Sequence, residues 1–188
     1  MIDVALKFLR QELNSYLIRK KGASSHQVDF THLTANNGEG KDFNLGMSLV
    51  NLEEERKIKD QKFYREDATG KQIKVNPQIK LNMYVLFTAK LEDHYDQALE
   101  YLGLIVQFFQ ANTYFNTKTH PGLDPGVEKL IVDLYTLSFE QQNNLWGSLS
   151  TRYLPSVLYK VRLVAVQDIS SIESMPAWDT GNYNLGGN

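Results

Sequence analysis

The sequence predicts an α+β fold, in which a mixed β-sheet of about four to six strands is packed by three helices. Three observations predict it. From Ile79, apolar and polar side chains alternate as in a half-buried strand; a long helical pattern follows almost directly; and shorter strand-like and helical segments occur on both sides of this unit. We place one domain at residues 1–168, with a projecting β-arm, and an irregular C-terminal tail at residues 169–188.

Composition limits the class of protein. The chain has 188 residues, of which 42% are hydrophobic and 22% charged, as expected of one domain with a substantial core. The formal net charge of −2 gives no basic surface for phosphate contacts, so we expect no nucleic-acid partner. Cysteine is absent, which excludes disulfides and thiolate metal sites. Without a bilayer-spanning apolar run or a secretory signal, we expect no membrane partner and a cytoplasmic location.

The first segments of the chain predict a helix and a hairpin. Apolar residues from Ile2 to Leu17 follow helical spacing, and cations precede Gly22 as they do at helix ends. A short strand at 28–30, a turn-rich run at 36–40 and a second strand from Phe43 then suggest a β-hairpin. In that second strand the apolar positions change phase at Leu49–Val50, which predicts a β-bulge.

A charged run follows this strand and is expected to project into water or against a partner. Residues 58–75 continue it, with a turn-like segment at 67–70, and we interpret them as a returning β-arm; a disordered loop is the alternative. The residues predicted to dock a partner are Glu53, Glu54, Glu55, Arg56, Lys57 and Tyr64.

The strand from Ile79 and the helix after it are expected to form the centre of the fold. Core positions are predicted at Met83, Val85, Phe87, Leu102, Ile105, Val132 and Val161. The helix carries one apolar stripe that includes Tyr95, Leu99 and Val106, and a second one of Tyr101, Leu104 and Phe108. The second stripe exceeds what one core-facing side can bury, so it faces either another layer of the domain or a neighbouring subunit. We assign Tyr101, Leu104 and Phe108 to a subunit interface.

The remaining segments complete the sheet. Turn residues predict an irregular loop at 111–126, and alternation from Leu130 to Leu134 predicts a strand. Ser138 and Gln141 match a capping box, which starts a short helix. A last strand follows Pro155, with its apolar residues inward and Lys160 and Arg162 outward.

No set of residues in the sequence makes a convincing catalytic, metal or cofactor site. The best candidate is a magnesium-dependent nuclease of the PD-(D/E)xK kind, from Asp42 and the run Glu55-Arg56-Lys57. Asp42 lacks the preceding proline, and the Glu-x-Lys triplet lies in a charged run. The histidines lie in separate segments without the spacing of zinc ligands. We therefore expect a protein that is not an enzyme and that needs no cofactor.

Several segments, taken in order, resemble the N-terminal-domain family of cap proteins, the tail terminators of phage-tail-like contractile injection systems. They are Leu49-Val50-Asn51-Leu52-Glu53-Glu54-Glu55-Arg56, Asn76-Pro77-x-Ile79 with Leu81-Asn82-Met83-Tyr84-Val85-Leu86-Phe87, Tyr95-Asp96-x-Ala98-Leu99 leading to Phe108-Phe109-Gln110, Leu137-Ser138 leading to Leu145-Trp146, and Tyr153-x-Pro155-Ser156-Val157-x-Tyr159-Lys160-Val161-Arg162.

This resemblance implies a non-enzymatic structural protein. It would form a ring of identical subunits, expected to be a homohexamer, at the distal end of the tube or sheath and stop its polymerisation. Its partners would be further copies of itself and the sheath or tube protein; it would be cytoplasmic during assembly and then part of the injection particle. The nuclease, or a generic adaptor protein within the same particle, is the alternative function.

Overall fold

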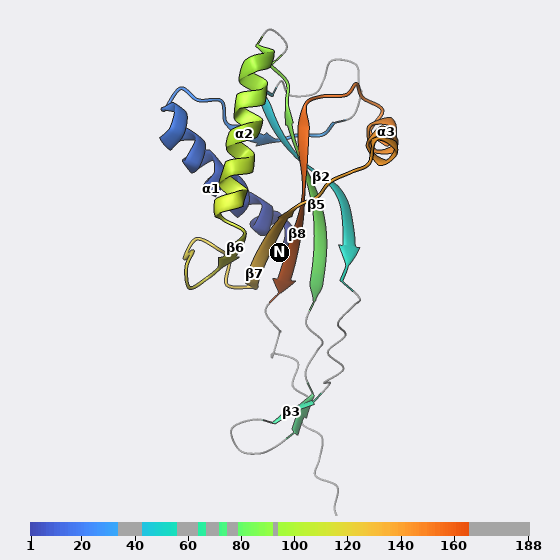
Figure 1. Cartoon of the computed structure of the whole chain (residues 1–188). Helices are drawn as coiled ribbons and strands as arrows, with labels where there is room; N and C mark the ends of the chain where they lie inside the picture. The colour runs from blue at the N-terminus through green and yellow to red at the C-terminus, as the bar shows by residue number, and fades with distance from the viewer. Residues whose placement is uncertain (34–42, 56–63, 67–71, 75–78, 92–93, 166–188) are drawn as a thin grey trace, which may run out of the picture. The chain divides into compact units, whose positions relative to one another are not determined.

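The computed structural model describes residues 1–33, 43–55, 64–66, 72–74, 79–91 and 94–165 (Figure 1). The chain divides into two compact units. The first comprises residues 1–57 and 79–166, and the second comprises residues 58–78 and 167–188. Of the predicted site residues, Arg56 and Lys57 lie outside the described residues, as does the predicted tail at 169–188.

The first unit is built on a six-stranded sheet with the strand order β1-β2-β5-β8-β7-β6. The neighbours β2 and β5, β5 and β8, β8 and β7, and β7 and β6 are antiparallel. In chain order the strands are β1 (Val28–Phe30), β2 (Leu45–Glu54), β5 (Lys80–Ala89), β6 (Tyr114–Asn116), β7 (Val127–Leu134) and β8 (Ser156–Ala165). The strand predicted at the centre of the fold, β5, lies inside the sheet, between β2 and β8.

The first two strands correct the predicted hairpin. β1 and β2 are parallel, with Val28 opposite Leu45 and Phe30 opposite Met47. A tight turn can join only antiparallel strands, because a parallel neighbour requires the chain to travel back before it pairs. The predicted bulge is confirmed: the register between β2 and β5 shifts between Leu49 and Asn51.

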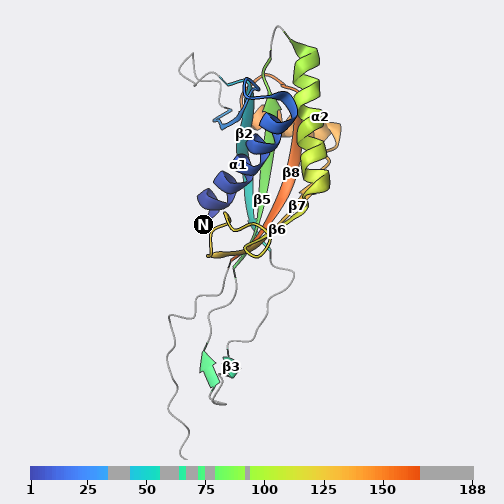
Figure 2. The same ribbon diagram turned by 90° about the vertical axis from the view of Figure 1, so that its left-hand side faces the viewer.

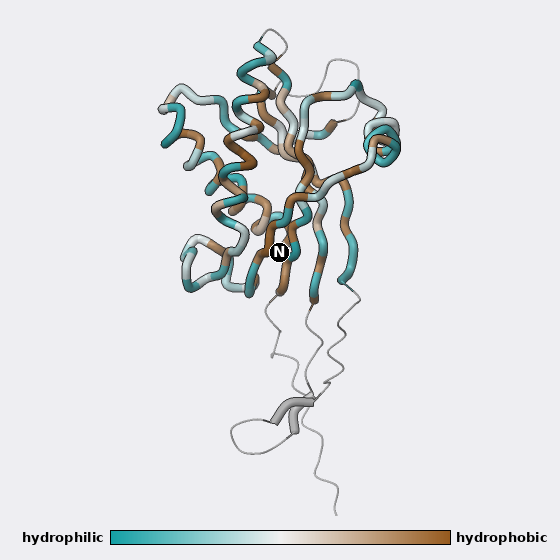
Figure 3. Tube along the Cα trace, in the orientation of Figure 1, coloured by the Kyte–Doolittle hydropathy of each residue, from teal (hydrophilic) through white to brown (hydrophobic). Residues whose placement is uncertain are grey.

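Two helices form a layer on one face of the sheet, α1 (Ile2–Lys21) and α2 (Tyr95–Ala111) (Figures 1 and 2). Apolar positions gather in the central strands and along α2 (Figure 3). All seven predicted core residues lie in this core: Met83, Val85, Phe87, Leu102, Ile105, Val132 and Val161. The ring of Phe87 contacts those of Phe109 and Tyr159, with centroids 5.4 and 5.9 Å apart.

The third helix, α3 (Phe139–Ser148), packs on the opposite face of the sheet. A smaller cluster of Leu33, Leu86, Trp146 and Leu158 holds it there. Leu86 and Leu158 alternate along their strands with Phe87 and Tyr159 of the main core, so they point to the other side. The predicted capping box begins this helix: Gln141 N–H donates to Ser138 Oγ, and Ser138 N–H donates to Gln141 Oε1.

Two further strand assignments complete the comparison with the sequence. The predicted loop at 111–126 contains the edge strand β6, whose Phe115 lies opposite Leu130 of β7. Within the second unit, β3 (Tyr64–Glu66) and β4 (Gln72–Lys74) pair antiparallel, as a β-arm requires. No helix within the described parts of the chain is long and apolar enough to cross a membrane.

Candidate assembly surfaces

The acidic residues predicted for partner docking begin inside the sheet. β2 continues through Glu54, which lies opposite Leu81 of β5, and the backbone N–H of Glu55 donates to the Lys80 carbonyl. Glu53 and Glu54 are thus still paired within the sheet while both residues are exposed to water. Long strands tolerate such charges when the outer side of the sheet is wet or the charges find partners.

A polar cluster on the face that carries α3 ties down the end of β2. Glu53 accepts hydrogen bonds from the Tyr84 hydroxyl and from Asn51 Nδ2, both at 3.0 Å. Glu55 accepts one from Asn82 Nδ2 at 3.1 Å, and its Oε2 lies 3.7 Å from Arg162 Nε. Burial, followed by the hydrogen bond to Glu53, raises the pKa of Tyr84 to about 12. The cluster stiffens this end of the sheet.

This cluster has no arrangement suited to the nuclease chemistry. Glu55, the proposed magnesium ligand, is engaged by Asn82 and Arg162, while Asp42 lies outside the described residues. Within the described ranges, no three acidic or histidine side chains lie close enough together to hold a metal ion. Nothing in this geometry favours hydrolysis over a structural role.

Among the described residues, the outer edge of β2 is paired only at its beginning. β1 pairs with residues 45–47, the Thr31 N–H donates to the Met47 carbonyl, and Ser48 Oγ donates to the Thr31 carbonyl. From Leu49 to Glu54, no other strand of the described chain pairs with this edge. Leu49 and Leu52 are exposed along it. Such an edge can accept a strand from another chain.

Tyr64, the last of the residues predicted to dock a partner, belongs to β3 in the second unit.

The predicted interface stripe on α2 faces the second helix of the same layer. Tyr101 and Phe108 are 5% and 3% exposed, and Leu104 is partly buried against the core. The Tyr101 hydroxyl accepts a hydrogen bond from the His26 N–H at 3.0 Å, and the Phe108 ring lies 5.3 Å from that of Tyr16 in α1. We expected that the domain could not bury this second stripe in its own core. That expectation is wrong for Tyr101 and Phe108, because α1 and the loop after it cover both side chains.

The exposed flank of α2 is one edge of the other stripe. Tyr95 and Leu99 are exposed and Val106 is partly exposed, whereas the other members of that stripe are buried: Ala98, Leu102, Ile105 and Phe109. Below Val106 a hollow of about 380 Å³ opens between α2 and the strands β7 and β8. Its lining is Val106, Phe109, Gln110, Thr113, Val132, Asp133, Leu134 and Tyr159, and Leu134 is 56% exposed. Sequence reasoning missed this surface because it assigned the Tyr95, Leu99 and Val106 stripe to the core.

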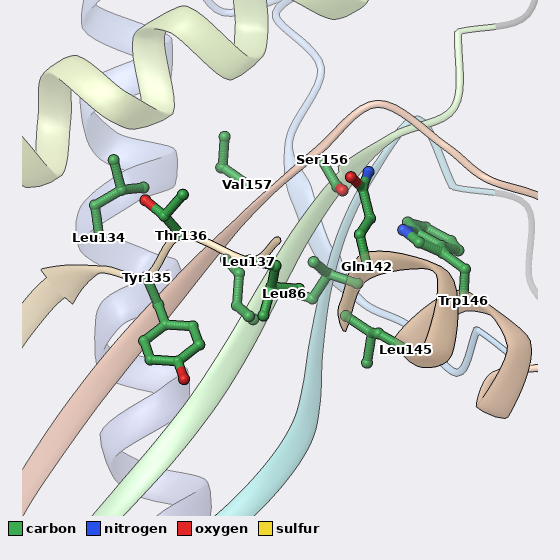
Figure 4. Close-up of a pocket in the computed structure, with 11 residues that line it drawn as sticks. Leu86, Leu134, Tyr135, Thr136, Leu137, Gln142, Leu145, Trp146, Ser156 and Val157 are labelled. Atoms are coloured by element: carbon green, nitrogen blue, oxygen red, sulfur yellow. The ribbon is translucent and has the colours of Figure 1, made fainter. Parts of the chain in front are cut away.

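A second hollow lies on the other face of the sheet, beside α3. It measures about 200 Å³, and Figure 4 shows Leu137 and Leu145 near Leu86 of β5, with Trp146 farther along α3. Phe139, the first residue of α3, does not line it and is 92% exposed. Aromatic side chains are enriched in protein–protein interfaces relative to the rest of the surface.

Comparison with known proteins extends this description. Two solved structures share the fold over nearly the complete chain. One is the PVC sheath/tube terminator in the extended state, from an extracellular contractile injection system, with 15% identity and a TM-score of 0.63 over 100% of this chain and 64% of that one. The other is the tube terminating cap of the anti-feeding prophage, with 13% identity and a TM-score of 0.59 over 94% of this chain and 59% of that one. The chain thus spans about three fifths of their lengths.

The curated proteins contain no match. The family model described as the Pvc16 N-terminal domain matches residues 5–177, which is most of the chain and includes both helical layers and the sheet. The resemblance seen in the sequence is confirmed by this match. The chain therefore belongs to the Pvc16 N-terminal domain family.

Proposed function

We propose that this protein is a structural cap of a contractile injection system. It forms a ring, expected to be a homohexamer, at the distal end of the tube or sheath and terminates polymerisation there. The observation that carries the proposal is the fold shared with a sheath/tube terminator and a tube terminating cap. Membership of the Pvc16 N-terminal domain family supports it independently of the fold comparison.

The proposed partners are further copies of the chain and the sheath or tube protein. The end of β2 is the proposed docking surface on the particle, with Glu53, Glu54 and Glu55 followed by Arg56, Lys57 and the arm that contains Tyr64. Its support is the uncovered edge from Leu49 to Glu54, where an extended segment of a tube or sheath subunit can add main-chain hydrogen bonds. The hydrogen bond from Tyr84 to Glu53 orders the end of this edge before docking, which lowers the ordering cost.

The proposed role is structural, without an enzymatic activity, a cofactor, a nucleic-acid partner or a membrane partner. The contacts of Glu55 with Asn82 and Arg162 give it a role in the sheet, which speaks against the nuclease alternative. A generic adaptor in the same particle would share the fold but would not control length. Assembly is proposed to take place in the cytoplasm, before the cap becomes part of the finished particle.

A terminating cap and a generic adaptor differ in one property, because only the cap sets the length of the tube and sheath. We expect particles assembled without this protein to have sheaths and tubes of widely scattered length, because nothing stops their growth, and re-expression of the wild-type chain to restore a narrow distribution. Electron microscopy of the purified particles measures both. A length distribution that stays narrow in the deletion strain would contradict the proposal, and so would an affinity tag on the chain that labels the particle along its side.

A further inference from the structure

Phe139 and the hollow beside α2 form a complementary pair of surfaces. Phe139 is 92% exposed at the start of α3, and the helix beneath it is fixed by the capping box and by Trp146 in the small core cluster. The residues that follow it on the helix surface are polar: Glu140, Gln141, Asn143 and Asn144 are exposed. An aromatic anchor surrounded by polar residues is the arrangement of an interface hot spot with a water-excluding rim.

The hollow between α2 and the strands β7 and β8 has the size and chemistry to receive this ring. Its volume is about 380 Å³, whereas a cavity of roughly 150 Å³ already binds benzene. Its walls include Val106, Val132, Leu134 and the Tyr159 ring, with Gln110 and Thr113 among the polar residues of its lining. Leu134 and Val106 are partly accessible in the isolated chain, so a partner that covers them removes apolar surface from water.

The two surfaces lie on opposite faces of one sheet. α3 packs on Leu86 and Leu158, while the hollow is walled by Tyr159 and Val132 of the main core. A knob and a hole on different sides of a subunit produce a head-to-tail contact, which closes into a ring when the rotation between neighbours permits. We infer that Phe139 of one copy inserts into the hollow lined by Val106, Leu134 and Tyr159 of the next copy. This inference rests on the proposed ring and names its subunit contact.

The smaller hollow beside α3 is the alternative binding site for Phe139 of another copy. It lies on the same face as Phe139 and is lined by Leu137 and Leu145. A knob and hole on one face would pair two copies reciprocally about a two-fold axis and stop at a dimer. The larger hollow is therefore the one compatible with a ring, and the two possibilities differ in the size of the assembly.

Point variants test the contact through the oligomeric state. Phe139→Ser and Val106→Asp, the latter at a residue that lines only the larger of the two hollows, should each keep the fold and raise the dissociation constant for subunit association about 10- to 100-fold, the equivalent of losing one buried apolar side chain. Tyr114→Ser and Leu52→Asp are the matched controls, because these residues are also exposed but lie on β6 and β2. Analytical ultracentrifugation over a concentration series gives the constants. Variants that assemble as tightly as their controls would overturn the inference.

Cross-linking identifies the contact directly, since the chain contains no cysteine and introduced thiols are the only ones present. A Gln110→Cys, Asn143→Cys double variant keeps Phe139 and Val106 and places one thiol at the hollow and one on α3, so treatment with a short bis-maleimide should give a ladder of covalent species up to the closed ring. The control pair, Leu52→Cys with Asn143→Cys, should give none. A double variant that yields only covalent dimers would overturn the inference in favour of the two-fold contact. A wild-type chain that stays monomeric at every concentration would overturn the proposed ring itself, whereas a double variant that still forms the ring but does not cross-link would overturn only this contact.

Discussion

Gly46 in β2 occupies a position where the packing leaves no room for a side chain. A Cβ there would lie 2.6 Å from Thr31 Cγ2 and from Thr88 Oγ1, and 2.8 Å from the ring of Phe43. Gly103 in α2 is its counterpart, because a Cβ there would meet no atom within 4 Å. The packing therefore requires a glycine at Gly46 but not at Gly103. Substitution of each glycine by alanine should have opposite effects on stability.

We expect Gly46→Ala to lower the free energy of unfolding by about 1–3 kcal/mol, since overpacking shifts the neighbouring groups. Gly103→Ala should raise it by about 0.4–1 kcal/mol, because alanine restricts the unfolded chain and favours the helix. Urea unfolding of both variants measures these changes. Shifts of the same sign in the two variants would contradict the packing described around Gly46.

Tyr84 should make the stability of the protein depend on alkaline pH. Its pKa rises from 10.0 to about 12, chiefly through burial and then through its hydrogen bond to Glu53. A raised pKa means that the neutral hydroxyl is favoured in the folded state, so its contribution is complete below pH 10 and is lost as the pH approaches 12. Burial also raises the pKa of Tyr159 to about 12, which adds to the same alkaline loss.

The Tyr84→Phe variant should therefore lose stability less steeply than the wild type between about pH 10 and 12. Urea unfolding at several pH values gives the slope for both proteins. An unchanged slope in Tyr84→Phe would show that neither burial nor the Glu53 hydrogen bond favours the neutral hydroxyl in the folded state.

Among the secondary-structure elements, α2 shows the difference between a buried and an exposed apolar stripe. Phe108 is 3% exposed under α1, and Leu99 is 49% exposed on the opposite flank. Phe108→Asp should unfold the protein or cost more than about 4 kcal/mol, because it buries an unpaired charge. Leu99→Asp should change the unfolding free energy by less than about 0.5 kcal/mol. Circular dichroism during denaturation checks both. A stable, folded Phe108→Asp variant would contradict the position of α1 over this stripe.

The charged end of β2 should govern docking on the particle. Reversing the charges of Glu54 and Arg56 together should weaken capping and make it more sensitive to salt, because such charges act on encounter and register. The fraction of capped particles at increasing salt, counted in electron micrographs, measures the effect. Lys118→Glu, in the loop after β6, reverses an exposed charge at a residue that belongs to neither proposed contact and is the control. Equal capping by the double variant and the control at all salt concentrations would refute a docking role for this segment.

Strong periodicity made some elements predictable from the sequence. Alternation through β5 placed Val85 and Phe87 in the core, and helical spacing placed α2 directly after it. The apolar residues of α2 occur on two sides, so the spacing defined two stripes without showing which one α1 covers. That choice depends on contacts between residues far apart in the sequence, such as Tyr16 with Phe108. The first stripe was consequently taken as core-facing throughout, although its Tyr95, Leu99 and Val106 edge is accessible.

Other features lacked a local signal. β6 consists of three residues next to a turn-rich loop, and its strand geometry comes from pairing with β7. The orientation of β1 was wrong because a three-residue strand and a turn-rich run fit a hairpin as well as a parallel pair. The exposed position of Phe139 could not be derived either, since its capping box fixes where α3 begins and leaves open which residues α3 covers.

For the complete protein, the sheet separates two kinds of surface. One face carries α1, α2 and the larger hollow, and the other carries α3 with Phe139 and the polar cluster that ends at Glu55. A subunit with unlike faces would suit the proposed ring, and the β2 edge that no strand of the described residues pairs beyond Met47 would suit attachment to a layer of a different protein. The proposed role uses both properties, because a terminating ring closes on itself and also occupies the growing end.

The growth of tubes and sheaths in the presence of the purified protein tests this role most directly. Tube and sheath subunits are polymerised with increasing amounts of the wild-type chain, and filament lengths are measured by electron microscopy. We expect the mean length to fall as the chain is added, with a ring visible at one end of each stopped filament, and the Phe139→Ser variant to require a higher concentration for the same effect. Filaments that keep growing to the same length at every concentration, with the chain absent from their ends, would contradict the role of a terminating cap.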